Sequence, residues 1–481
     1  MRTLSHHVKK ARTRVSIPGP TSPNFPLVGY YPVLFKPLLQ LFNELGAKYG
    51  EVFKFRLFNS EYIILNSFDA INEAYSQQSE KFSHRPTKFT FLKFAHKFLK
   101  GYSFTVGSDF KIQKRFFMQK LRAFTLKDPQ FFTTIGNNCN FLLLYLDSKS
   151  AKPVDLRELF AWIAINSISH VLCSKYFELN DDRWKQLYQN ANLFFASMPG
   201  IDQSIIGVQF RLFKAIFRSK SYRDLIKSSD FFYKTANEWV NEKLCNYNSS
   251  EINDYIDSFI HESLKDSHKT FNREQLIGNL IQFIIAGSDT TTNTMYFACY
   301  MLAKHPNIQA AMQKEIDEVV GNERFPTLED RRVLIYTEAF FREIDRYYAL
   351  APISIIRVNS DEVMVQGFKI PKGCNFIANT NNCLRDSKYF KNPFEFDPDN
   401  FINSNGELIN VQSFVPFGIG IRRCPGEMLA KIEIYLIIST IIQNFSLSLS
   451  TDENKEKEEL KGLIKVLRPY KVIAKRRIKQ R

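Results

Sequence analysis

The alternation of apolar and polar positions along the chain predicts a mostly helical protein. Apolar residues recur with helical spacing over residues 274–304, and Pro306 ends this stretch, so one long helix is expected there. At 1.5 Å per residue such a helix would span roughly 45 Å, enough to cross a whole domain, which makes it a central helix. Two further helices are predicted over residues 336–348 and from Pro425 to about Phe445.

Short β-strands are predicted towards both ends of the chain. Residues 52–65 alternate around Asn59-Ser60, as in a β-hairpin. Residues 363–370 and 375–378 form two more extended stretches, separated by a turn at residues 371–373. The predicted fold class is therefore mainly α with small β-sheets.

The length and composition of the chain indicate how it is divided into domains. The 481 residues are 44% apolar, which is ample for a large buried core. We divide the chain into a basic leader over residues 1–17, a single domain over residues 18–475 and a basic tail over residues 476–481. The leader carries five Lys and Arg residues before the first acidic residue, Glu44, and is expected to be flexible.

The net charge of the chain indicates which classes of partner it is expected to bind. A net charge of +16 favours contact with an anionic membrane or an acidic protein. Apart from the tail, the Lys and Arg residues form no dense block with interleaved aromatic residues, so no nucleic-acid binding is expected. No run of about 20 apolar residues occurs, so no transmembrane helix is predicted. The leader predicts peripheral membrane contact, with a mitochondrial address as the alternative.

Seven cysteines are spread along the chain. No two of them have CxxC spacing, so neither a zinc site nor a disulfide framework is indicated, and a reducing compartment fits best. Their number is odd and their spacings are wide. Any chemical role is therefore expected of a single cysteine rather than of a pair.

Cys424 follows a glycine-containing turn and precedes an expected helix. Gly418 and Gly420 permit a tight turn with backbone angles that other residues avoid. Cys424 is expected at the helix cap, with Pro425 at the first helical position. The N–H groups and partial positive charge of a helix start lower the pKa of a thiol and can donate to a thiolate.

Two neighbours of Cys424 favour a cofactor over a structural cysteine. Gly426 leaves space for a flat cofactor, and Arg422 is suited to a cofactor carboxylate. A lone cysteine at a helix start is usually structural. The convergence of these features instead favours a thiolate ligand.

The long central helix carries a second group of small and polar residues. Ala286, Gly287 and Thr290 share one face of the helix, where small side chains would let a flat ring and a diatomic ligand come close. The Thr290 hydroxyl can bond back to the preceding turn, and Asp289 is an ionisable group in an apolar stretch. Taken alone, this pattern would indicate ordinary helix packing.

The cysteine segment identifies a family. Its residues match the F-x-x-G-x-R-x-C-x-G signature of the cytochrome P-450 superfamily, and residues 286–291 match that family's A/G-G-x-D/E-T-T/S motif. The resemblance covers about residues 18–470. Within this family the chain is most similar to the animal microsomal branch that handles steroids, fatty acids and xenobiotics. The signature matches are Phe417, Gly420, Arg422, Cys424 and Gly426.

The resemblance implies a cofactor and roles for its neighbours. The chain is expected to adopt the cytochrome P-450 fold, with the long central helix over haem b and Cys424 as the axial thiolate ligand of the iron. Thr290 would steady bound dioxygen and Asp289 would help to relay protons. Arg357 and Lys114 are the further candidates for haem propionate contacts.

Two departures from the family pattern bear on haem retention. Glu343 and Arg346 match its E-x-x-R pair, but Asn400 stands where the family has the Arg that completes this network. Phe110 and Lys114 replace the Trp and Arg of its W-x-x-x-R segment. Haem retention is expected to be weaker unless other groups substitute.

The expected activity is insertion of one oxygen atom from O₂ into an apolar substrate, with electrons from NADPH through a flavoprotein reductase. The expected partner is NADPH–cytochrome P-450 reductase, or a ferredoxin if the protein is mitochondrial. The cytoplasmic face of the endoplasmic reticulum, by peripheral attachment, or the cytoplasm is the expected location.

Two alternative functions remain open at this point. One is a reductase-independent haem-thiolate isomerase or peroxygenase, against which the intact Asp289-Thr290 pair argues. The other is a non-catalytic haem-binding protein, which the replaced residues Phe110, Lys114 and Asn400 keep open.

Overall fold

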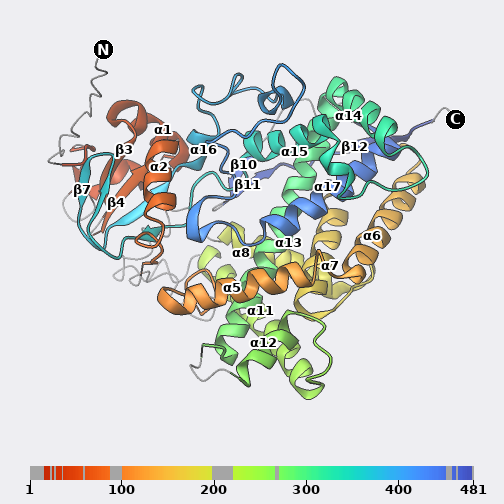
Figure 1. Cartoon of the computed structure of the whole chain (residues 1–481), viewed down its shortest axis with the longest axis horizontal. Coiled ribbons are helices and arrows are strands. Elements are labelled where there is room, and N and C mark those ends of the chain that lie inside the picture. Colours follow the sequence, from red (N-terminus) through yellow and green to blue (C-terminus); the bar gives the residue numbers. More distant parts are fainter. Residues whose placement is uncertain are drawn as a thin grey trace, which may run out of the picture. The chain divides into compact units, whose positions relative to one another are not determined.

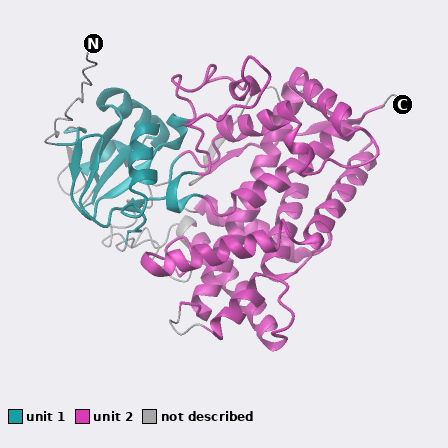
Figure 2. Cartoon of the chain, viewed as in Figure 1, with its two compact units in different colours: residues 1–87, 353–383, 418–423 teal, residues 88–352, 384–417, 424–481 magenta. Residues whose placement is uncertain are grey.

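A computed structural model describes most of the chain and divides it into two compact units. The first unit comprises residues 1–87, 353–383 and 418–423, and the second comprises residues 88–352, 384–417 and 424–481 (Figure 2). Each unit is described by itself. The described residues are 16–21, 24–25, 29–34, 36–57, 60–86, 100–197, 220–265, 270–450, 458–461 and 464–478.

A six-stranded sheet forms the centre of the first unit, in the order β1-β2-β3-β4-β8-β5. The predicted hairpin is present, with β3 (Val52–Leu57) antiparallel to β4 (Ser60–Leu65). The predicted strand β8 (Asn375–Ala378) pairs parallel to β4 and antiparallel to β5 (Arg357–Val358). The predicted extended stretch at 363–370 is a separate hairpin of β6 (Val363–Val365) and β7 (Phe368–Ile370).

Helices and turns complete the first unit. Phe42 of α1 packs against Phe53 of β3, with 6.2 Å between ring centroids, and both side chains are fully buried. The remaining elements of this unit are β1 (Asn24–Phe25), β2 (Gly29–Tyr30), the 3₁₀ helix η1 (Tyr31–Leu34), α1 (Leu38–Tyr49), α2 (Phe68–Asn72), the π-helical turn η2 (Glu73–Gln77), α16 (Thr380–Cys383) and the 3₁₀ helix η5 (Gly420–Arg422).

The second unit is built from long helices and small two-stranded sheets (Figure 1). Its sheets are the antiparallel pairs β10–β11 and β9–β12. Its elements are α5 (Gly107–Ala123), α6 (Pro129–Ser148), α7 (Arg157–Cys173), α8 (Asp182–Ser197), α11 (Lys220–Cys245), α12 (Tyr255–Ser263), α13 (Arg273–Lys304), α14 (Pro306–Val319), η3 (Asp330–Arg332), α15 (Ile335–Tyr348), η4 (Pro398–Phe401), α17 (Glu427–Asn444), β9 (Phe445–Leu449), β10 (Glu458–Lys461), β11 (Ile464–Leu467) and β12 (Val472–Arg476).

The helix α13 is the central element of this unit, as the sequence predicts. The side chain of Asn272 caps its start by accepting from the backbone N–H of Gln275, and the helix continues to Lys304 before Pro306. It packs against α7, α8, α11, α15 and α17. Because it has neighbours on all sides, it is apolar around most of its circumference and largely buried.

The helix α17 begins later than the sequence predicts. Pro425 and Gly426 form a turn, and the helix starts at Glu427 with Gly426 as its cap. The first helical hydrogen bond runs from the N–H of Ala430 to the carbonyl of Gly426. The expected cap at Cys424 is therefore wrong, because the chain uses two further residues to turn into the helix axis.

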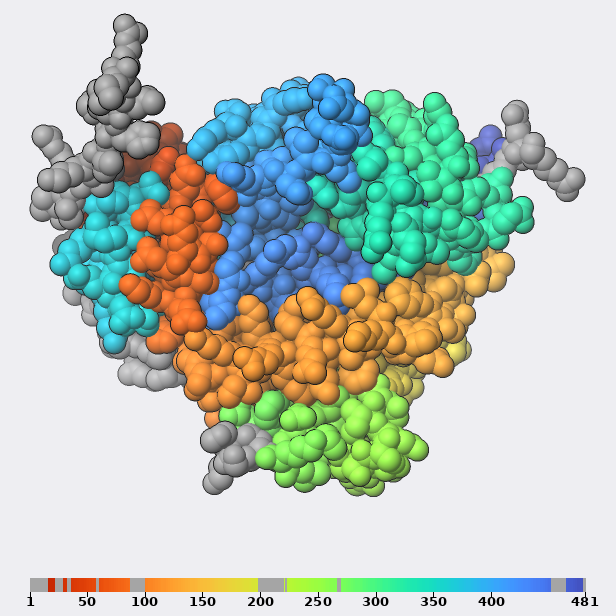
Figure 3. Space-filling model, in the orientation of Figure 1, coloured from red at the N-terminus to blue at the C-terminus, as the bar shows by residue number. Residues whose placement is uncertain are grey.

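The helix α17 also buries an ionisable group. The helix α17 packs against α6 and α14, which border it on the face shown in Figure 3. Glu433 is 1% exposed, and its Oε1 atom makes no hydrogen bond to the described residues. Burial raises the pKa of Glu433 to about 8, which the hydroxyl of Ser167 on α7 only partly offsets. The core of this unit therefore contains a carboxyl group that favours its neutral form.

The expected division into leader, single domain and tail stays a prediction. Residues 1–15 of the leader and 479–481 of the tail lie outside the described residues. Arg476 is the last residue of β12, and Arg477 pairs with Asp317 of the second unit. Among the described residues, no helix combines the length and apolar character needed to cross a bilayer.

Candidate functional site

The loop before Cys424 is closed by one backbone hydrogen bond. The N–H of Cys424 donates to the carbonyl of Phe417, with 2.9 Å between the two atoms. Gly418 and Gly420 both have positive φ, +71° and +73°, which L side chains rarely adopt. The tight glycine turn predicted from the sequence is therefore confirmed.

The middle of this loop is fixed by contacts within the first unit. The N–H of Ile421 donates to the Ser79 hydroxyl at 2.6 Å, and Arg422 Nε donates to the Ser83 carbonyl at 2.9 Å. At Gly420 the backbone of η2 comes so close that a Cβ atom would collide with the carbonyl oxygen of Tyr75. Gly420 is thus required for two reasons, its φ angle and the space that η2 occupies.

Replacing Gly420 by alanine is expected to disrupt the loop. The new methyl group would meet backbone atoms that cannot rotate away, so we expect a loss of about 3 kcal/mol or more of stability. Gly418→Ala is the matched control, because a Cβ there meets nothing within 4 Å and adds only positive-φ strain of about 1–2 kcal/mol. Thermal unfolding and haem content of both variants measure this difference, and equal losses would contradict it.

Cys424 itself is exposed, unlike most cysteines of the chain. Four of the seven, Cys139, Cys173, Cys299 and Cys383, are buried. Next to Cys424, a Cβ built on Gly426 would meet nothing within 4 Å. The thiol is therefore accessible from a side on which the protein leaves open space, as a flat cofactor requires.

The central helix is open at the positions that the sequence singles out. Between the buried residues Ile285 and Ser288, Ala286 is exposed and Gly287 is partly exposed, and Thr290 on the next turn is also partly exposed. The Thr290 hydroxyl donates to the carbonyl of Ala286 at 2.6 Å, which confirms the predicted bond to the preceding turn. Accessibility in the middle of a buried helix indicates a face built to receive a ligand.

Gly287 also has a packing role that the sequence did not indicate. A Cβ on this residue would come within 3.0 Å of the Ile168 side chain, on α7. The absence of a side chain at Gly287 therefore lets α7 and α13 approach closely. Its small size serves this helix contact as well as the open face beside Ala286.

Asp289 points away from solvent. It is 1% exposed, and Asn293 on the next turn donates from Nδ2 to the Asp289 carbonyl at 2.8 Å. Asn293 in turn accepts from Arg157 at 3.0 Å. Sequence reasoning missed Asn293, which contacts the Asp289 backbone, and Arg157, which contacts Asn293. Asn293 carries only the weak signal of lying four residues after Asp289, and Arg157 carries none because it comes from α7.

Arg357 is a buried cation with one donor atom that has no partner among the described residues. It is 4% exposed, its guanidinium carbon lies 3.7 Å from the centre of the Tyr75 ring, and Nη2 donates to the Ile419 carbonyl at 3.3 Å. Nη1 is buried with no partner among the described residues. Burial lowers the pKa of Arg357 to about 10, so the group remains charged at neutral pH. An anionic group such as a haem carboxylate fits this unsatisfied donor.

The other two propionate candidates are less enclosed. Arg422 is partly exposed and already donates to Ser83, and Lys114 on α5 is partly exposed. Phe110, which stands in place of the family's Trp, is 1% exposed and packs against Tyr102 with 5.4 Å between ring centroids. The ring at this position thus keeps the packing of an aromatic residue without the indole donor.

The Glu343–Arg346 pair is fully buried rather than on the surface. Arg346 contacts both carboxylate oxygens of Glu343 at 2.6 Å, and both side chains have no exposed area. The remaining donors of Arg346 reach the carbonyls of Leu384, Pro393 and Glu395. One guanidinium therefore ties α15 to the segment at residues 384–395.

Asn400 partly replaces the arginine that the family pattern has there. Its Nδ2 lies 3.4 Å from Glu343 Oε1, and the N–H of Asp397 donates to the same oxygen at 2.8 Å. Two neutral donors thus complete the environment of Glu343 without a second cation.

Comparison with known proteins agrees with this geometry. The family model for cytochrome P450 matches residues 18–474. Cytochrome P450 2A9 of Mesocricetus auratus is 31% identical over 442 residues, 89% of this chain and 87% of the relative. Cytochrome P450 2C3 of Oryctolagus cuniculus is 31% identical over 90% of this chain and 88% of the relative. Cytochrome P450 2C8 of Homo sapiens is 29% identical over 96% of this chain and 95% of the relative.

The match includes the loop at Cys424 and the open face of α13. The two features that the sequence singled out thus lie within a family match that covers all but the ends of the chain. The chain belongs to the cytochrome P450 family, and it is a haem-dependent monooxygenase.

Proposed function

We propose that the protein inserts one oxygen atom from O₂ into an apolar organic substrate of the steroid, fatty acid or xenobiotic class. Electrons would come from NADPH through a flavoprotein reductase. The observation that carries this proposal is the open face of α13 at Ala286, Gly287 and Thr290, in a helix that is otherwise buried. A partly exposed threonine beside a buried carboxyl group suits the handling of dioxygen and protons.

The chain offers groups for each part of a haem. Cys424 would supply the axial thiolate, and Gly426 leaves room beside it. Arg357, Arg422 and Lys114 are the candidates for its carboxylates, and the unsatisfied Nη1 of Arg357 is the best-supported one. When bound, haem with a thiolate ligand supplies the chemistry that activates O₂ and favours cleavage of the O–O bond.

Thr290 and Asp289 would manage the protons that this chemistry consumes. A threonine hydroxyl both donates and accepts, and Thr290 already holds one bond to Ala286 that it can exchange for one to a ligand. Asp289 is buried behind it and can hold a proton away from bulk water. Ala286 and Gly287 would keep the approach to Thr290 free of side chains.

The proposed partner is NADPH–cytochrome P450 reductase, at the endoplasmic reticulum. The similarity to the cytochrome P450 2A and 2C relatives supports this choice over a ferredoxin in the mitochondrion. The basic leader and the net charge of +16 support additional peripheral contact with an anionic membrane surface.

Thr290→Ala tests the proposal. The variant should still bind haem and substrate and still consume NADPH, because the methyl group removes only the hydroxyl. Without a donor at this position, product formed per NADPH should fall by roughly five- to tenfold, and hydrogen peroxide should account for the difference. Product, peroxide and NADPH are measured together in a reconstituted system.

Thr292→Ala is the matched control. Thr292 lies on the same helix and its hydroxyl makes the same kind of bond, to the Ser288 carbonyl at 2.6 Å, but it is fully buried. It should retain coupling. If Thr290→Ala also keeps full coupling with the native substrate, protons do not pass through this residue.

A further inference from the structure

The cation Arg357 is held mainly by an aromatic ring. Its guanidinium carbon lies 3.7 Å from the centre of the Tyr75 ring, and the two side chains are 4% and 1% exposed. The hydrogen bond that it donates, from Nη2 to the Ile419 carbonyl, is long at 3.3 Å. A desolvated contact between a guanidinium and a ring face is stronger than a bond of this length. Tyr75 is therefore the main contact that fixes this cation within the first unit.

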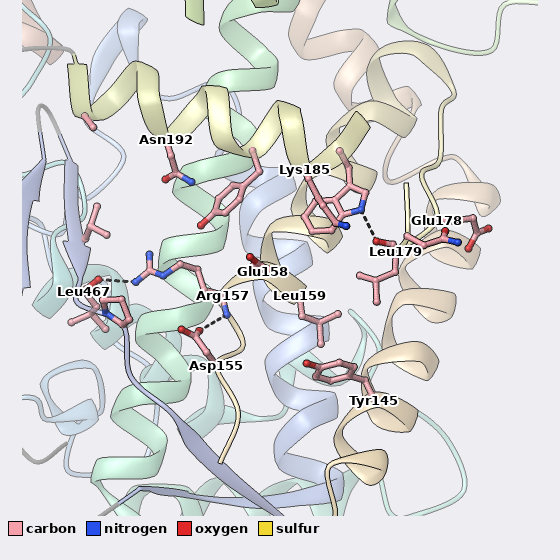
Figure 4. Close-up of a pocket in the computed structure, with 16 residues that line it drawn as sticks. Tyr145, Asp155, Arg157, Glu158, Leu159, Glu178, Leu179, Lys185, Asn192 and Leu467 are labelled. Atoms are coloured by element: carbon pink, nitrogen blue, oxygen red, sulfur yellow. Dashed lines mark hydrogen bonds between the residues drawn. The ribbon is translucent and has the colours of Figure 1, made fainter. Parts of the chain in front are cut away.

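A second buried arginine is held in a different way. Arg157 of α7, at the wall of a pocket in the second unit, also lies over a ring, with 4.1 Å between its guanidinium carbon and the centre of Tyr296. It donates to Asn293 at 3.0 Å and, as Figure 4 shows, to the Leu467 carbonyl at 2.7 Å. Short hydrogen bonds to the protein thus fix Arg157. Arg357 instead keeps its Nη1 atom without a partner among the described residues.

The state of the ring suits this arrangement. Burial raises the pKa of Tyr75, and Arg357 offsets the effect only in part, so the ring is a neutral phenol at neutral pH. The contact is then one between a cation and the negative face of a neutral ring. A planar guanidinium over a ring face keeps its N–H donors at its edge. The ring therefore holds the cation without occupying the donor at Nη1.

The turn that carries Tyr75 is itself fixed at both ends. The segment η2 is π-helical, and the N–H of Gln78 donates to the Glu73 carbonyl, five residues earlier, at 3.2 Å. Such turns are frequent at functional sites. At one end, Gln366 donates to Glu73 Oε2 from its backbone and from its side chain, at 2.8 Å each. At the other end, Gln78 donates from its side chain to the Met364 carbonyl at 2.7 Å.

We propose that Tyr75 positions Arg357 for a haem carboxylate and thereby slows the loss of haem from the protein. Tyr75 contacts the cation with its ring and lies against Gly420 with its backbone carbonyl, so one residue relates the cation to the loop. The contact would offset part of the haem retention that is expected to be lost with Phe110 and Lys114. This inference rests on the proposed function, in which Arg357 is a candidate for the haem carboxylates.

The rate of haem loss tests this role. Transfer of haem from the loaded protein to excess apomyoglobin is followed by absorbance. Tyr75→Leu removes the ring face, so haem loss should accelerate by roughly tenfold, as expected for a desolvated contact between a cation and a ring. Tyr75→Phe keeps the face and should stay within about twofold of the wild type. Pentafluorophenylalanine at position 75 keeps the shape of a phenyl ring without its negative face, so it should match Tyr75→Leu even if the leucine variant folds poorly.

The midpoint potential of the haem provides a second readout that does not depend on turnover. It should fall in Tyr75→Leu and stay unchanged in Tyr75→Phe. The reason is that a cation held close to the haem favours the reduced form, which carries more negative charge. An unchanged potential in Tyr75→Leu would contradict the proposed role.

A double-mutant cycle separates positioning from packing. Arg357→Gln removes the cation, and in this background Tyr75→Leu should not accelerate haem loss further, because no cation remains to be positioned. Phe53→Leu is the control for the loss of a buried ring in the same unit, since Phe53 is fully buried and packs against Phe42. It should lower the melting temperature and leave the rate of haem loss unchanged.

Three outcomes would overturn the inference. They are an equal acceleration by Tyr75→Leu in both backgrounds, equal rates in Tyr75→Phe and Tyr75→Leu, and an acceleration by Phe53→Leu as large as that by Tyr75→Leu. Failure of the proposed function looks different. If Arg357→Gln loses haem at the rate of the wild type, Arg357 does not contact a haem carboxylate. If Arg357→Gln loses haem faster while Tyr75→Leu does not, only the role of Tyr75 fails.

Discussion

Replacing Cys424 by serine should abolish the red-shifted Soret band of the reduced protein with carbon monoxide, together with all monooxygenase turnover. A thiolate pushes electron density towards the iron, and a serine hydroxyl, which stays protonated, does not. The substitution changes one atom on an exposed residue in a loop whose closing bond uses the backbone N–H of residue 424. The loop should therefore keep its shape, and the loss should be one of ligation. Absorbance spectra with and without carbon monoxide measure it.

Cys245→Ser is the control for this experiment. Cys245 is also exposed but ends α11, so its replacement should leave the band intact. Retention of the red-shifted band in Cys424→Ser would mean that another residue ligates the iron.

The buried carboxyl group of Glu433 should make the stability of the protein fall as pH rises. Its pKa is about 8 in the folded protein against an ordinary value of 4.5 for a solvated glutamate, so the folded state holds the proton more tightly than the unfolded state. The contribution to stability is complete below about pH 4.5 and decreases by about 1.4 kcal/mol per pH unit up to pH 8, roughly 4–5 kcal/mol in total. Glutamine cannot ionise, so Glu433→Gln should remove this dependence.

Urea unfolding of the wild type and Glu433→Gln between pH 5.5 and about pH 8.5 measures the effect as a difference, in which the other titrating groups cancel. The free energy of unfolding of the wild type should decline relative to the variant up to about pH 8 and then level off. Glu318→Gln serves as the control, because this carboxylate of α14 is exposed and pairs only with Lys314 among the described residues. Parallel curves for the wild type and Glu433→Gln would show that Glu433 is ionised in the folded state.

The sequence predicted the elements that local pattern determines. The bounds of α13 agree with the predicted helix to within one residue, because Asn272 caps one end and Pro306 stops the other. The strand β8 has the predicted bounds. The start of α17 was wrong because Pro425 is equally compatible with a turn and with a first helical position, and only the path of the chain decides between them.

The candidate site was predictable where neighbouring residues carry it. The glycine turn before Cys424 and the bond from Thr290 to Ala286 both follow from spacings of a few residues. The environment of Asp289 was not predictable. Arg157, which donates to Asn293 one turn after Asp289, lies 136 residues from Asn293 in the sequence. Such groups come together only through tertiary packing, which cannot be predicted from the spacing of neighbouring residues in the sequence.

Glu433 illustrates the same limit for a single residue. In the sequence it is one charged position in an apolar helix and would ordinarily be assigned to the surface. The apolar residues on all sides of α17 are what bury it. Similarly, the Glu343–Arg346 spacing suggests a surface pair, and only the folded chain shows that η4 and the segment before it enclose both side chains.

The loop from Phe417 to Cys424 also has consequences for how this gene can change. The hydrogen bonds of Cys424, Ile421 and Arg422 depend on the number of residues between these three positions. A shift of the sequence by one residue would also place a side chain where Gly420 lies, and it would collide with η2. Codon substitutions at Ile419 or Arg423 leave that count intact. An in-frame insertion or deletion of one codon inside the segment changes the spacing between these contacts, so selection should preserve the length of this segment more strictly than its composition.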